Sequence, residues 1–359
     1  MRILQIIDSL EAGGAERMAV NYANALADEI DFSGLVVTRK EGALWNQLNN
    51  KVSYLFLNKK RTINIKALFR LRNYLILNKV THIHAHSTSF FIAFLVKITY
   101  PRIQLIWHDH YGDSEFLVNR PKRILKRVIP FFNGIIAVNH QLKSWAEENK
   151  LSKNSVNLPN FPSKESDVAE HTILKGTKGK RILCLANLRV QKNHFLVLEV
   201  ANKINKSHPE WTFHLVGKDF EDDYSKQIKK QIRVFSLEDK VFLYGSRQDI
   251  SSILEQSDIA ILTSQSEGLP LALLEYGRHK KPVVVTNVGE IPRLIQDGFN
   301  GFVVDASSPS LFYDALIKLI ESDSLQKIFG IALHQKIVSN YSQETIIKEY
   351  LYWVKNSCR

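Results

Sequence analysis

The sequence predicts an α/β protein built from two doubly wound domains, each a parallel sheet with helices on both faces. The chain has 359 residues, which is more than one hydrophobic core usually serves. In both halves short apolar runs alternate with amphipathic helical segments, a pattern typical of parallel strands joined by right-handed helical crossovers. Between the halves, residues 163–180 are polar and show no periodicity, which indicates an inter-domain connection.

The first domain is assigned to residues 1–165. It opens with a strand, a loop that contains two glycines, and a helix from Ala15 whose apolar residues keep a helical spacing. The later apolar runs are each followed by a helix-like segment, so we expect them to form parallel strands. The expected strands of this domain are 2–8, 34–38, 52–57, 82–86, 104–107 and 134–138.

The second domain is assigned to residues 166–340, where the alternation begins again. A helix is expected from about Asn193. The last segment, 341–359, carries a predicted helix over 343–355 with one apolar face, for which the first domain is a candidate packing surface. The expected strands of the second domain are 181–186, 211–216, 240–244, 259–263 and 282–286.

The net charge of +12 is concentrated in the first half. Residues 1–165 contain 23 Lys and Arg against 13 Asp and Glu, whereas residues 166–359 contain 25 against 23. Basic runs begin at Lys59 and at Arg120, and they are either solvated helix faces or a surface for anionic lipid headgroups or a diphosphate-linked acceptor. A nucleic-acid partner is not expected, because the chain lacks zinc-finger spacing, an RNA-recognition signature and a basic-zipper heptad.

The composition indicates a cytoplasmic protein. The only cysteines, Cys184 and Cys358, are too few for a disulfide framework or a zinc ribbon. The first residues are typical of a strand and not of a signal peptide, and no apolar run approaches the roughly 20 residues that cross a bilayer. If a membrane is involved, we expect a peripheral protein at its inner face.

The strongest functional signal is the segment 264–277, directly after the last residues of a predicted strand. Pro270 suits the first position of a helix, because its missing N–H has no partner there. Gly268 and Leu269 would then lie at a helix N-terminus, where backbone N–H groups and the helix dipole favour an anion. The sequence therefore predicts an anion site at this turn.

Two acidic and two basic residues are candidates to serve the same ligand. Glu267 and Glu275 lie on either side of the turn, where Glu275 would accept hydrogen bonds from a ribose diol and Glu267 from hydroxyls of a sugar. Arg189 and Lys192 follow the first strand of the second domain and would offer a fork and a point charge to a diphosphate. An exposed basic loop is the alternative for that pair, but the acidic segment favours the ligand role.

These residues resemble the motifs of glycosyltransferase family 4. Members of that family carry a Glu-x7-Glu motif, matched here by Glu267 and Glu275, and fold as two Rossmann-like domains that face each other across a cleft, the GT-B architecture. The resemblance covers nearly the whole chain. Further matches are the acceptor-side glycine loop with Gly13, Gly14 and Glu16, the strand 82–86, the diphosphate loop 188–194, the nucleotide-side turns with Gly217, Tyr244 and Gly245, and the blocks 258–275 and 282–289.

The resemblance implies a role for each group. Glu267, Arg189 and Lys192 are expected to be catalytic, together with a histidine that ends a first-domain strand beside the reacting sugar. His108 is the preferred histidine, and His110 is its rival. Donor binding is expected from Gly217, Tyr244, Gly245, Gly268, Leu269, Pro270 and Glu275, and acceptor binding from Gly13, Gly14, Glu16 and His110.

Neither a metal nor a cofactor is expected. His84 and His86 are interpreted as strand histidines with satisfied hydrogen bonds, and the acidic run 219–223 as a loop that opens a helix. One departure from the family is Asn187, because many relatives have an arginine at that position of the diphosphate loop. This departure leaves the reach of Arg189 open.

The implied function is that of a retaining, metal-independent glycosyltransferase of the hexosyltransferase type. It would move a sugar from a nucleotide diphosphate to a saccharide or a lipid-linked saccharide in cell-surface polysaccharide synthesis. Arg189, Lys192 and the helix N-terminus would stabilise the charge on the leaving diphosphate. Two alternatives share the fold: a nucleotide-sugar 2-epimerase, and a non-catalytic nucleotide-sugar-binding protein.

Overall fold

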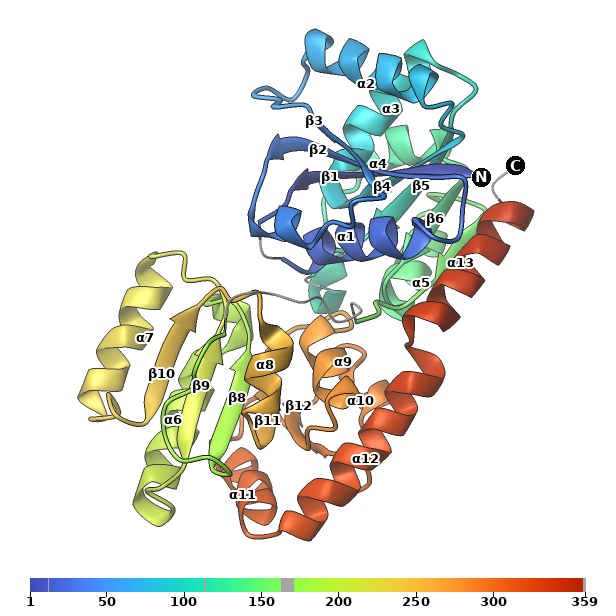
Figure 1. The fold of residues 1–359 in the computed structure, drawn as a ribbon. Helices are drawn as coiled ribbons and strands as arrows, with labels where there is room; N and C mark the ends of the chain where they lie inside the picture. Colours follow the sequence, from blue (N-terminus) through green and yellow to red (C-terminus); the bar gives the residue numbers. More distant parts are fainter. Residues whose placement is uncertain (12, 113, 163–170, 358–359) are drawn as a thin grey trace. The chain divides into compact units, whose positions relative to one another are not determined.

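The chain folds into two compact α/β units in a computed structural model that describes residues 1–11, 13–112, 114–162 and 171–357 (Figure 1). Unit 1 comprises Met1–Lys164 and Ser342–Arg359, and unit 2 comprises Glu165–Tyr341. The domain boundary expected between residues 165 and 166 lies outside the described residues.

Unit 1 contains a seven-stranded parallel sheet in the order β3-β2-β1-β4-β5-β6-β7. Its central strands are largely buried on both faces, as expected for a parallel sheet between helical layers, and β4 differs from its neighbours in carrying three histidines among its five residues. The strands are β1 (Arg2–Ser9), β2 (Phe32–Lys40), β3 (Ser53–Phe56), β4 (His82–His86), β5 (Gln104–Asp109), β6 (Gly134–Ala137) and β7 (Ser155–Asn157).

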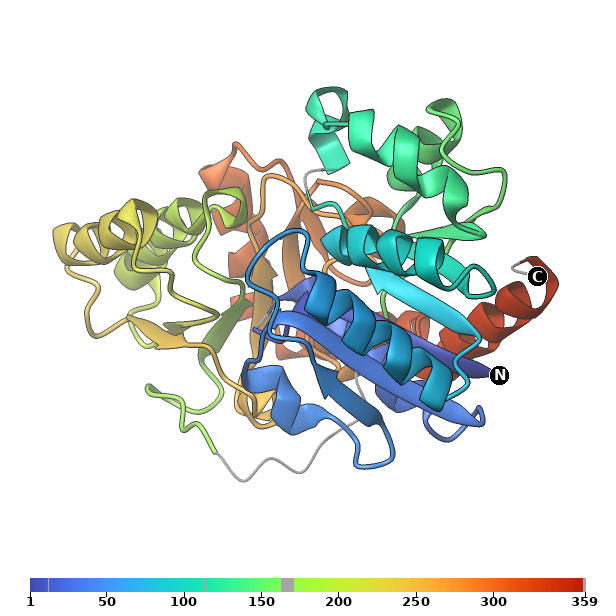
Figure 2. The same cartoon turned by 90° about the horizontal axis from the view of Figure 1, so that it is seen from above.

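Helices cover both faces of this sheet. On one face α2 (Ile65–Leu77), α3 (Phe90–Thr99), α4 (Arg123–Val128) and α5 (His140–Glu148) share a hydrophobic core with Leu4, Ile83 and Leu105 of the sheet. Figure 2 shows α2 and α3 side by side on this face. The other face is covered by α1 (Gly14–Leu26) and by α13 (Gln343–Ser357).

The C-terminal helix α13 therefore belongs to unit 1. Tyr350 is fully buried, and its ring lies 5.1 Å from the ring of Tyr22 on α1. Trp353 packs against Gly134 at the start of β6 and donates a hydrogen bond to Asn154 at 3.0 Å. These contacts close the face of the sheet on which the histidines of β4 and β5 lie.

Unit 2 contains a six-stranded parallel sheet in the order β10-β9-β8-β11-β12-β13. The strands are β8 (Arg181–Leu185), β9 (Thr212–Val216), β10 (Val241–Gly245), β11 (Ile259–Leu262), β12 (Val283–Thr286) and β13 (Phe302–Val304). One core joins α6 (His194–Ser207), α7 (Asp223–Val234) and α11 (Pro309–Ile320), and the other joins α8 (Ile250–Glu255), α9 (Leu271–Arg278), α10 (Ile291–Leu294) and α12 (Asp323–Asn340).

The predicted fold class of two doubly wound α/β domains is confirmed, and every expected strand is found within two residues of its predicted ends. Two strands were not predicted, β7 and β13, and each is only three residues long at the edge of its sheet. An edge strand of that length carries too little hydrophobic pattern to be recognised. Short 3-10 helices of three to six residues, from η1 (Ala43–Gln47) to η5 (Val190–Lys192), complete the described secondary structure.

Candidate functional site

The strand order of each sheet reverses at one point. In unit 1 the reversal lies between β1 and β4, and in unit 2 it lies between β8 and β11. In open α/β sheets, ligands bind beyond the carboxyl ends of the strands at such a switch point, because the loops on either side turn away from each other. The candidate glycines Gly13 and Gly14 follow β1, Arg189 and Lys192 follow β8, and residues 267–270 follow β11. The other candidates lie on or after neighbouring strands, or in helices that follow these loops.

The switch point of unit 2 holds an ion pair between a partly buried lysine and a buried glutamate. Lys192 Nζ, from the loop after β8, lies 2.5 Å from Glu267 Oε1 in the loop after β11. The side chains are 19% and 7% exposed, and Ser264 donates a second hydrogen bond, of 2.6 Å, to the same carboxylate oxygen. The two residues that sequence reasoning assigned to one ligand therefore lie together, in a place that is largely closed to water.

Two further hydrogen bonds join the same loops. Gln265 N donates to Gln191 O at 2.8 Å, and the Thr263 hydroxyl donates to Lys192 O at 2.9 Å. The loop after β12 adds a third wall, because Gly289 has a φ of +56° and a Cβ atom there would overlap the Glu267 carbonyl. Only glycine fits this position without strain.

Helix α9 begins one residue later than the sequence predicted. Pro270 has a ψ of 123°, so it is the extended N-cap residue and Leu271 is the first helical residue. The helix is fixed to the sheet by the Tyr276 hydroxyl, which accepts from Leu185 N at 2.7 Å and donates to Ile261 O at 3.2 Å. Glu275, next to that tyrosine, is buried with 8% of its surface exposed.

Arg189 does not join the ion pair. It is exposed, and its guanidinium carbon lies 4.5 Å from the ring centroid of Phe220. Asn187, which stands where many relatives have an arginine, accepts a hydrogen bond from Lys218 N at 2.7 Å and so joins the loops after β8 and β9. Arg189 thus makes a cation–π contact with Phe220 beside the switch point.

The three predicted nucleotide-side residues make internal contacts. A Cβ atom at Gly217 would overlap the backbone of Ala186, so glycine permits the loops after β8 and β9 to touch. Gly217 N donates to the carbonyl of Gly245, which has a φ of +68°. The Tyr244 hydroxyl accepts from the backbone N–H of Lys175 at 3.0 Å. The described contacts therefore explain these residues by loop packing.

In unit 1 the glycine loop follows β1 at the switch point. Gly13 is the extended N-cap of α1, with a φ of −158°, and Gly14 is the first helical residue. The Glu16 side chain folds back into the space beside Gly13 that a Cβ atom would need. A carboxylate in this place is favoured by the N-terminus of α1.

Four histidines form two hydrogen-bonded pairs across β4 and β5. His84 Nε2 lies 3.0 Å from His108 Nδ1, and His86 Nδ1 lies 3.0 Å from His110 Nε2. The rings of each pair are stacked, with interplanar angles of 13° and 21°. His108 is fully buried beneath Tyr22 of α1, whereas His110 follows the end of β5 and is partly exposed. Of the two candidate histidines, only His110 lies beyond the carboxyl end of β5, at the edge of the sheet formed by the strand ends.

Burial keeps these histidines neutral. It lowers the pKa of His84, His86 and His108 well below the ordinary histidine value, and lowers the pKa of His110 to about 3. An imidazolium in this cluster would lose its hydration and would face the neighbouring histidines. Near neutral pH each ring therefore carries one proton and one lone pair.

Within the described residues, His84, His86 and His108 are the one group close enough to share a metal ion, with ligand atoms within 4.8 Å of one another. Both nitrogens of His86 are already engaged, and the group contains no carboxylate that could balance a divalent charge. We therefore interpret it as a hydrogen-bonded cluster. The expectation of satisfied strand histidines holds for His86 but is wrong for His84, whose Nδ1 has no partner among the described residues.

Family models match both units. The model described as Glycosyltransferase Family 4 matches residues 12–160, and the model described as Glycosyl transferases group 1 matches residues 163–335. This chain belongs to glycosyltransferase family 4. The enzyme is a glycosyltransferase, and the predicted family and enzyme class are confirmed.

Relatives span the length of this glycosyltransferase. An uncharacterized glycosyltransferase of Haemophilus influenzae is 26% identical over 94% of this chain and 95% of its own. The UDP-Gal:alpha-D-GlcNAc-diphosphoundecaprenol alpha-1,3-galactosyltransferase of Escherichia coli is 23% identical over 92% and 90%. The crystal structure of Anabaena HepE in complex with UDP-glucose has a TM-score of 0.81 at 18% identity and covers 99% of both chains. This structural likeness supports the GT-B fold.

Sequence reasoning missed two residues that build unit 1 of the glycosyltransferase. Arg120, which it placed in a basic run, is buried and forms a two-pronged ion pair of 2.6 and 2.8 Å with Asp109, next to His110. Its guanidinium also lies 4.3 Å from the ring of Trp145. Gln5 is buried in β1 beside His86, and the signal for it was a polar residue inside an apolar strand.

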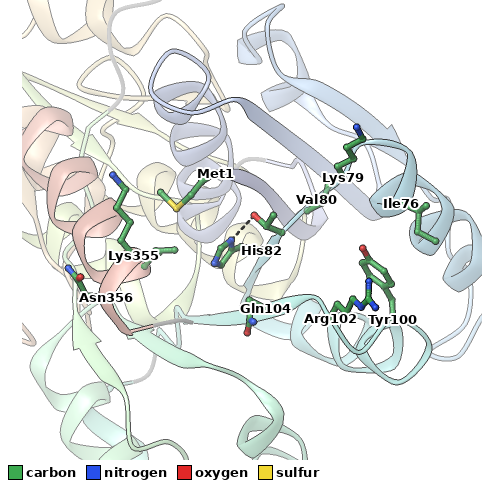
Figure 3. Close-up of a pocket in the computed structure, with 12 residues that line it drawn as sticks. Met1, Ile76, Lys79, Val80, His82, Tyr100, Arg102, Gln104, Lys355 and Asn356 are labelled. Carbon is green, nitrogen blue, oxygen red and sulfur yellow. Dashed lines mark hydrogen bonds between the residues drawn. The ribbon is translucent and has the colours of Figure 1, made fainter.

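A cavity of about 740 Å³ lies in unit 1 of the glycosyltransferase at the opposite edge of the sheet (Figure 3). It is lined by Met1, by Gln104 at the start of β5 and by Lys355 of α13, and it includes His82 at the start of β4. These are the amino ends of the strands, whereas the candidate residues follow the carboxyl ends. The cavity is therefore separate from the candidate site.

Proposed function

We propose that this glycosyltransferase transfers a sugar from a uridine diphosphate donor held by unit 2 to a lipid-linked or polymeric saccharide held by unit 1. The observation that carries the proposal is the partly buried Lys192–Glu267 pair at the switch point of unit 2. The choice of uridine is supported by the UDP-glucose complex of HepE and by the UDP-galactose donor in the name of the Escherichia coli relative.

When the donor binds, its diphosphate would replace Glu267 as the partner of Lys192. Its diphosphate attracts Lys192, which frees Glu267 to accept hydrogen bonds from hydroxyls of the sugar. Arg189 needs only to leave the ring of Phe220 to add a second cation. Together with the backbone N–H groups before α9, these cations stabilise the negative charge that builds on the leaving diphosphate. The proposed mechanism thus needs no metal or further cofactor.

Glu275 would bind the ribose of the nucleotide. It lies in the second turn of α9, and the Tyr276 anchors hold that helix against β8 and β11. A carboxylate accepts hydrogen bonds from two neighbouring hydroxyls, which a ribose diol supplies. We assign the retention of anomeric configuration on the family pattern, with no enzymic nucleophile among the residues named.

His110 is proposed as the histidine that meets the reacting sugar. His108, the preferred candidate of the sequence, is fully buried and pairs with His84, so it does not reach the sheet edge. A neutral His110 avoids placing a positive charge beside a sugar that itself becomes oxocarbenium-like in the transition state.

An anionic bilayer surface is proposed as the place where the acceptor is met. Helix α2 exposes Ile65, Phe69 and Leu77, which are 67%, 51% and 80% exposed, and between them lie the exposed cations Lys66 and Arg70. Basic residues with exposed apolar side chains suit the headgroup region of an anionic membrane. Among the described residues, no helix is both long enough and apolar enough to cross a bilayer.

Two measurements test the identity of the donor nucleotide and the transfer of its sugar. We expect UDP-sugars, and not guanosine or adenosine diphosphate sugars, to raise the melting temperature, because a ligand stabilises the state that binds it. Mass spectrometry with a polyprenyl-diphosphate-linked saccharide should then show the added sugar. An epimerised nucleotide sugar formed without acceptor would contradict glycosyl transfer as the activity.

The membrane surface is tested by flotation with vesicles. Wild-type protein should bind phosphatidylglycerol-containing vesicles, and the double variant Phe69→Glu, Leu77→Glu should lose most of that binding. Leu311→Glu in unit 2, where Leu311 is 55% exposed, is the matched control and should bind as the wild type does. Equal binding by the wild type and the double variant would remove α2 from the surface.

A further inference from the structure

Gln5, His86 and His110 form a line of hydrogen bonds that runs from the interior of unit 1 to the edge of its sheet. The Oε1 atom of Gln5, on β1, lies 2.8 Å from Nε2 of His86, on β4. Nδ1 of His86 lies 3.0 Å from Nε2 of His110, after β5. The line crosses the switch point between β1 and β4. Gln5 and His86 are fully buried, and His110 is partly exposed.

The chemistry of these groups fixes where each proton lies. An amide oxygen only accepts hydrogen bonds, so Nε2 of His86 must carry a proton. A neutral imidazole has one N–H, and therefore Nδ1 of His86 is a lone pair that requires a donor. That donor is Nε2–H of His110, which leaves Nδ1 of His110 without a proton. Nδ1 of His110 has no hydrogen bond to the part of the chain that the structure describes.

We propose that Gln5 and His86 are positioning residues that hold His110 in the Nε2–H tautomer, so that its Nδ1 lone pair accepts a hydrogen bond from a sugar hydroxyl. The identity of that hydroxyl rests on the proposed function, but the tautomer does not. Neither Gln5 nor His86 touches the substrate, because both are fully buried.

The tautomer matters because it decides what His110 offers at the sheet edge. A lone pair accepts from a hydroxyl and raises the electron density on its oxygen, whereas an N–H would donate to it. If the amide of Gln5 presented its nitrogen to His86, the donor and the acceptor would be exchanged in both hydrogen bonds of this Gln5–His86–His110 relay. His110 would then expose an N–H. Gln5 on β1 thus sets which atom His110 offers after β5, two strands away in the sheet.

The pair His84–His108 supplies a matched control within the same cluster. His84 lies two residues before His86 on the same strand, is equally buried, and makes a hydrogen bond of the same 3.0 Å length to a β5 histidine. It does not contact Gln5 or His110 through any hydrogen bond of the described residues. A purely structural role for these histidines predicts equal effects of His84→Asn and His86→Asn.

The first experiment observes the tautomer directly. In protein with 15N-labelled histidine, protonated and unprotonated ring nitrogens give separate nitrogen resonances. We expect Nδ1 of His110 to be unprotonated and Nε2 protonated in the wild type and in His84→Asn, and we expect Gln5→Met to give a mixture. A protonated Nδ1 in the wild type would overturn the proposal. This measurement needs no turnover, so it stands even if no sugar is transferred.

The second experiment is kinetic. Gln5→Met should lower kcat roughly tenfold, the size expected when one hydrogen bond of about 1.4 kcal/mol no longer orients a group, with the KM for the donor little changed. His86→Asn should lower kcat at least as much, and His84→Asn far less. Equal losses in His84→Asn and His86→Asn would show that the cluster acts by packing alone.

Gln5→Glu gives a pH-dependent test. A carboxylate beside His86 raises the pKa of that histidine, and a doubly protonated His86 would donate from Nδ1 to His110 and reverse its tautomer. The variant should therefore work at high pH and lose activity as the pH falls, at a pH where the wild type is still active. The other titratable groups packed around the cluster are His84 and His108 on the strands, Tyr22 on α1 and Tyr350 on α13. Further charges nearby are the exposed Glu349, which acts on Tyr22, and the Asp109–Arg120 ion pair next to His110. If the variant and the wild type lost activity at the same pH as the solution was acidified, the relay would be contradicted.

Discussion

The two switch points of this glycosyltransferase share a topology but differ in chemistry. In unit 2 the neighbouring loops bring together opposite charges, Lys192 and Glu267, in a partly buried position. In unit 1 the adjacent strands β4 and β5 bring together imidazoles, and burial keeps them neutral by holding the pKa of His86 and His110 low. The difference fits the two halves of the proposed reaction. A leaving diphosphate gains negative charge and needs cations, whereas the sugar gains positive charge and is better served by neutral acceptors.

Removing the charged pair of unit 2 should have the largest effect. Lys192→Ala and Glu267→Ala should each lower turnover roughly a hundred- to a thousandfold, because each removes a group that acts on the transition state. Lys226→Ala is the control, since Lys226 is an exposed lysine whose carboxylate partner is also exposed. Near-normal turnover in both site variants would refute the site in unit 2.

Unit 1 has its own buried charges, but we expect them to act on stability. Arg120→Met should lower the free energy of unfolding by about 3 kcal/mol, since it leaves Asp109 buried without its cation. The exposed neighbour Arg123 is the control, and Arg123→Met should change stability by less than about 0.5 kcal/mol. Urea unfolding measures both. If Arg120→Met and Arg123→Met unfolded at the same urea concentration, the Asp109 loop would be held by other contacts.

The choice between the two histidines sharpens the comparison further. His110→Asn should lower kcat roughly a hundredfold with little loss of stability, because it removes a group at the sheet edge. His108→Asn should instead lower the melting temperature, since it opens space under Tyr22 and removes the partner of His84. If His108→Asn were the slower enzyme at a temperature where both variants are folded, the sequence-based preference for His108 would be restored.

Two glycines of unit 2 give the smallest and most controlled comparison. Gly298 and Gly289 have similar φ angles, +71° and +56°, but only Gly289 would place a Cβ atom against the Glu267 carbonyl. Gly298→Ala should lower the free energy of unfolding by about 1 kcal/mol through its backbone conformation alone. Gly289→Ala should lower it further and also slow turnover. Equal stability and activity in the two variants would show that the loop after β12 does not support Glu267.

The layered fold was predictable because its signals are local. Most central strands are short apolar runs before a helix, and all of the central strands, including the histidine-rich β4, were recognised. The edge strands β7 and β13 were missed because three residues are too few to show a hydrophobic periodicity. The Glu267 segment was also predictable, since the turn and the acids are adjacent in the chain.

The histidine relay could not be predicted, because it depends on non-local packing. The sequence does not reveal that β1 and β4 are neighbours, which brings Gln5 beside His86, or that Tyr22 of α1 covers His108. Arg120 was misread for the same reason. A lysine- and arginine-rich run suggests a solvated surface, and only the fold shows that one of its members enters the core.

The most direct test of the contrast between the two switch points is a thermal-shift titration of UDP against three proteins. UDP should raise the melting temperature of the wild type and of His110→Asn by similar amounts, because the nucleotide is held by unit 2. It should raise that of Lys192→Ala much less. Equal stabilisation of Lys192→Ala and the wild type, or a loss of stabilisation in His110→Asn, would contradict the division of charged and neutral chemistry between the two units.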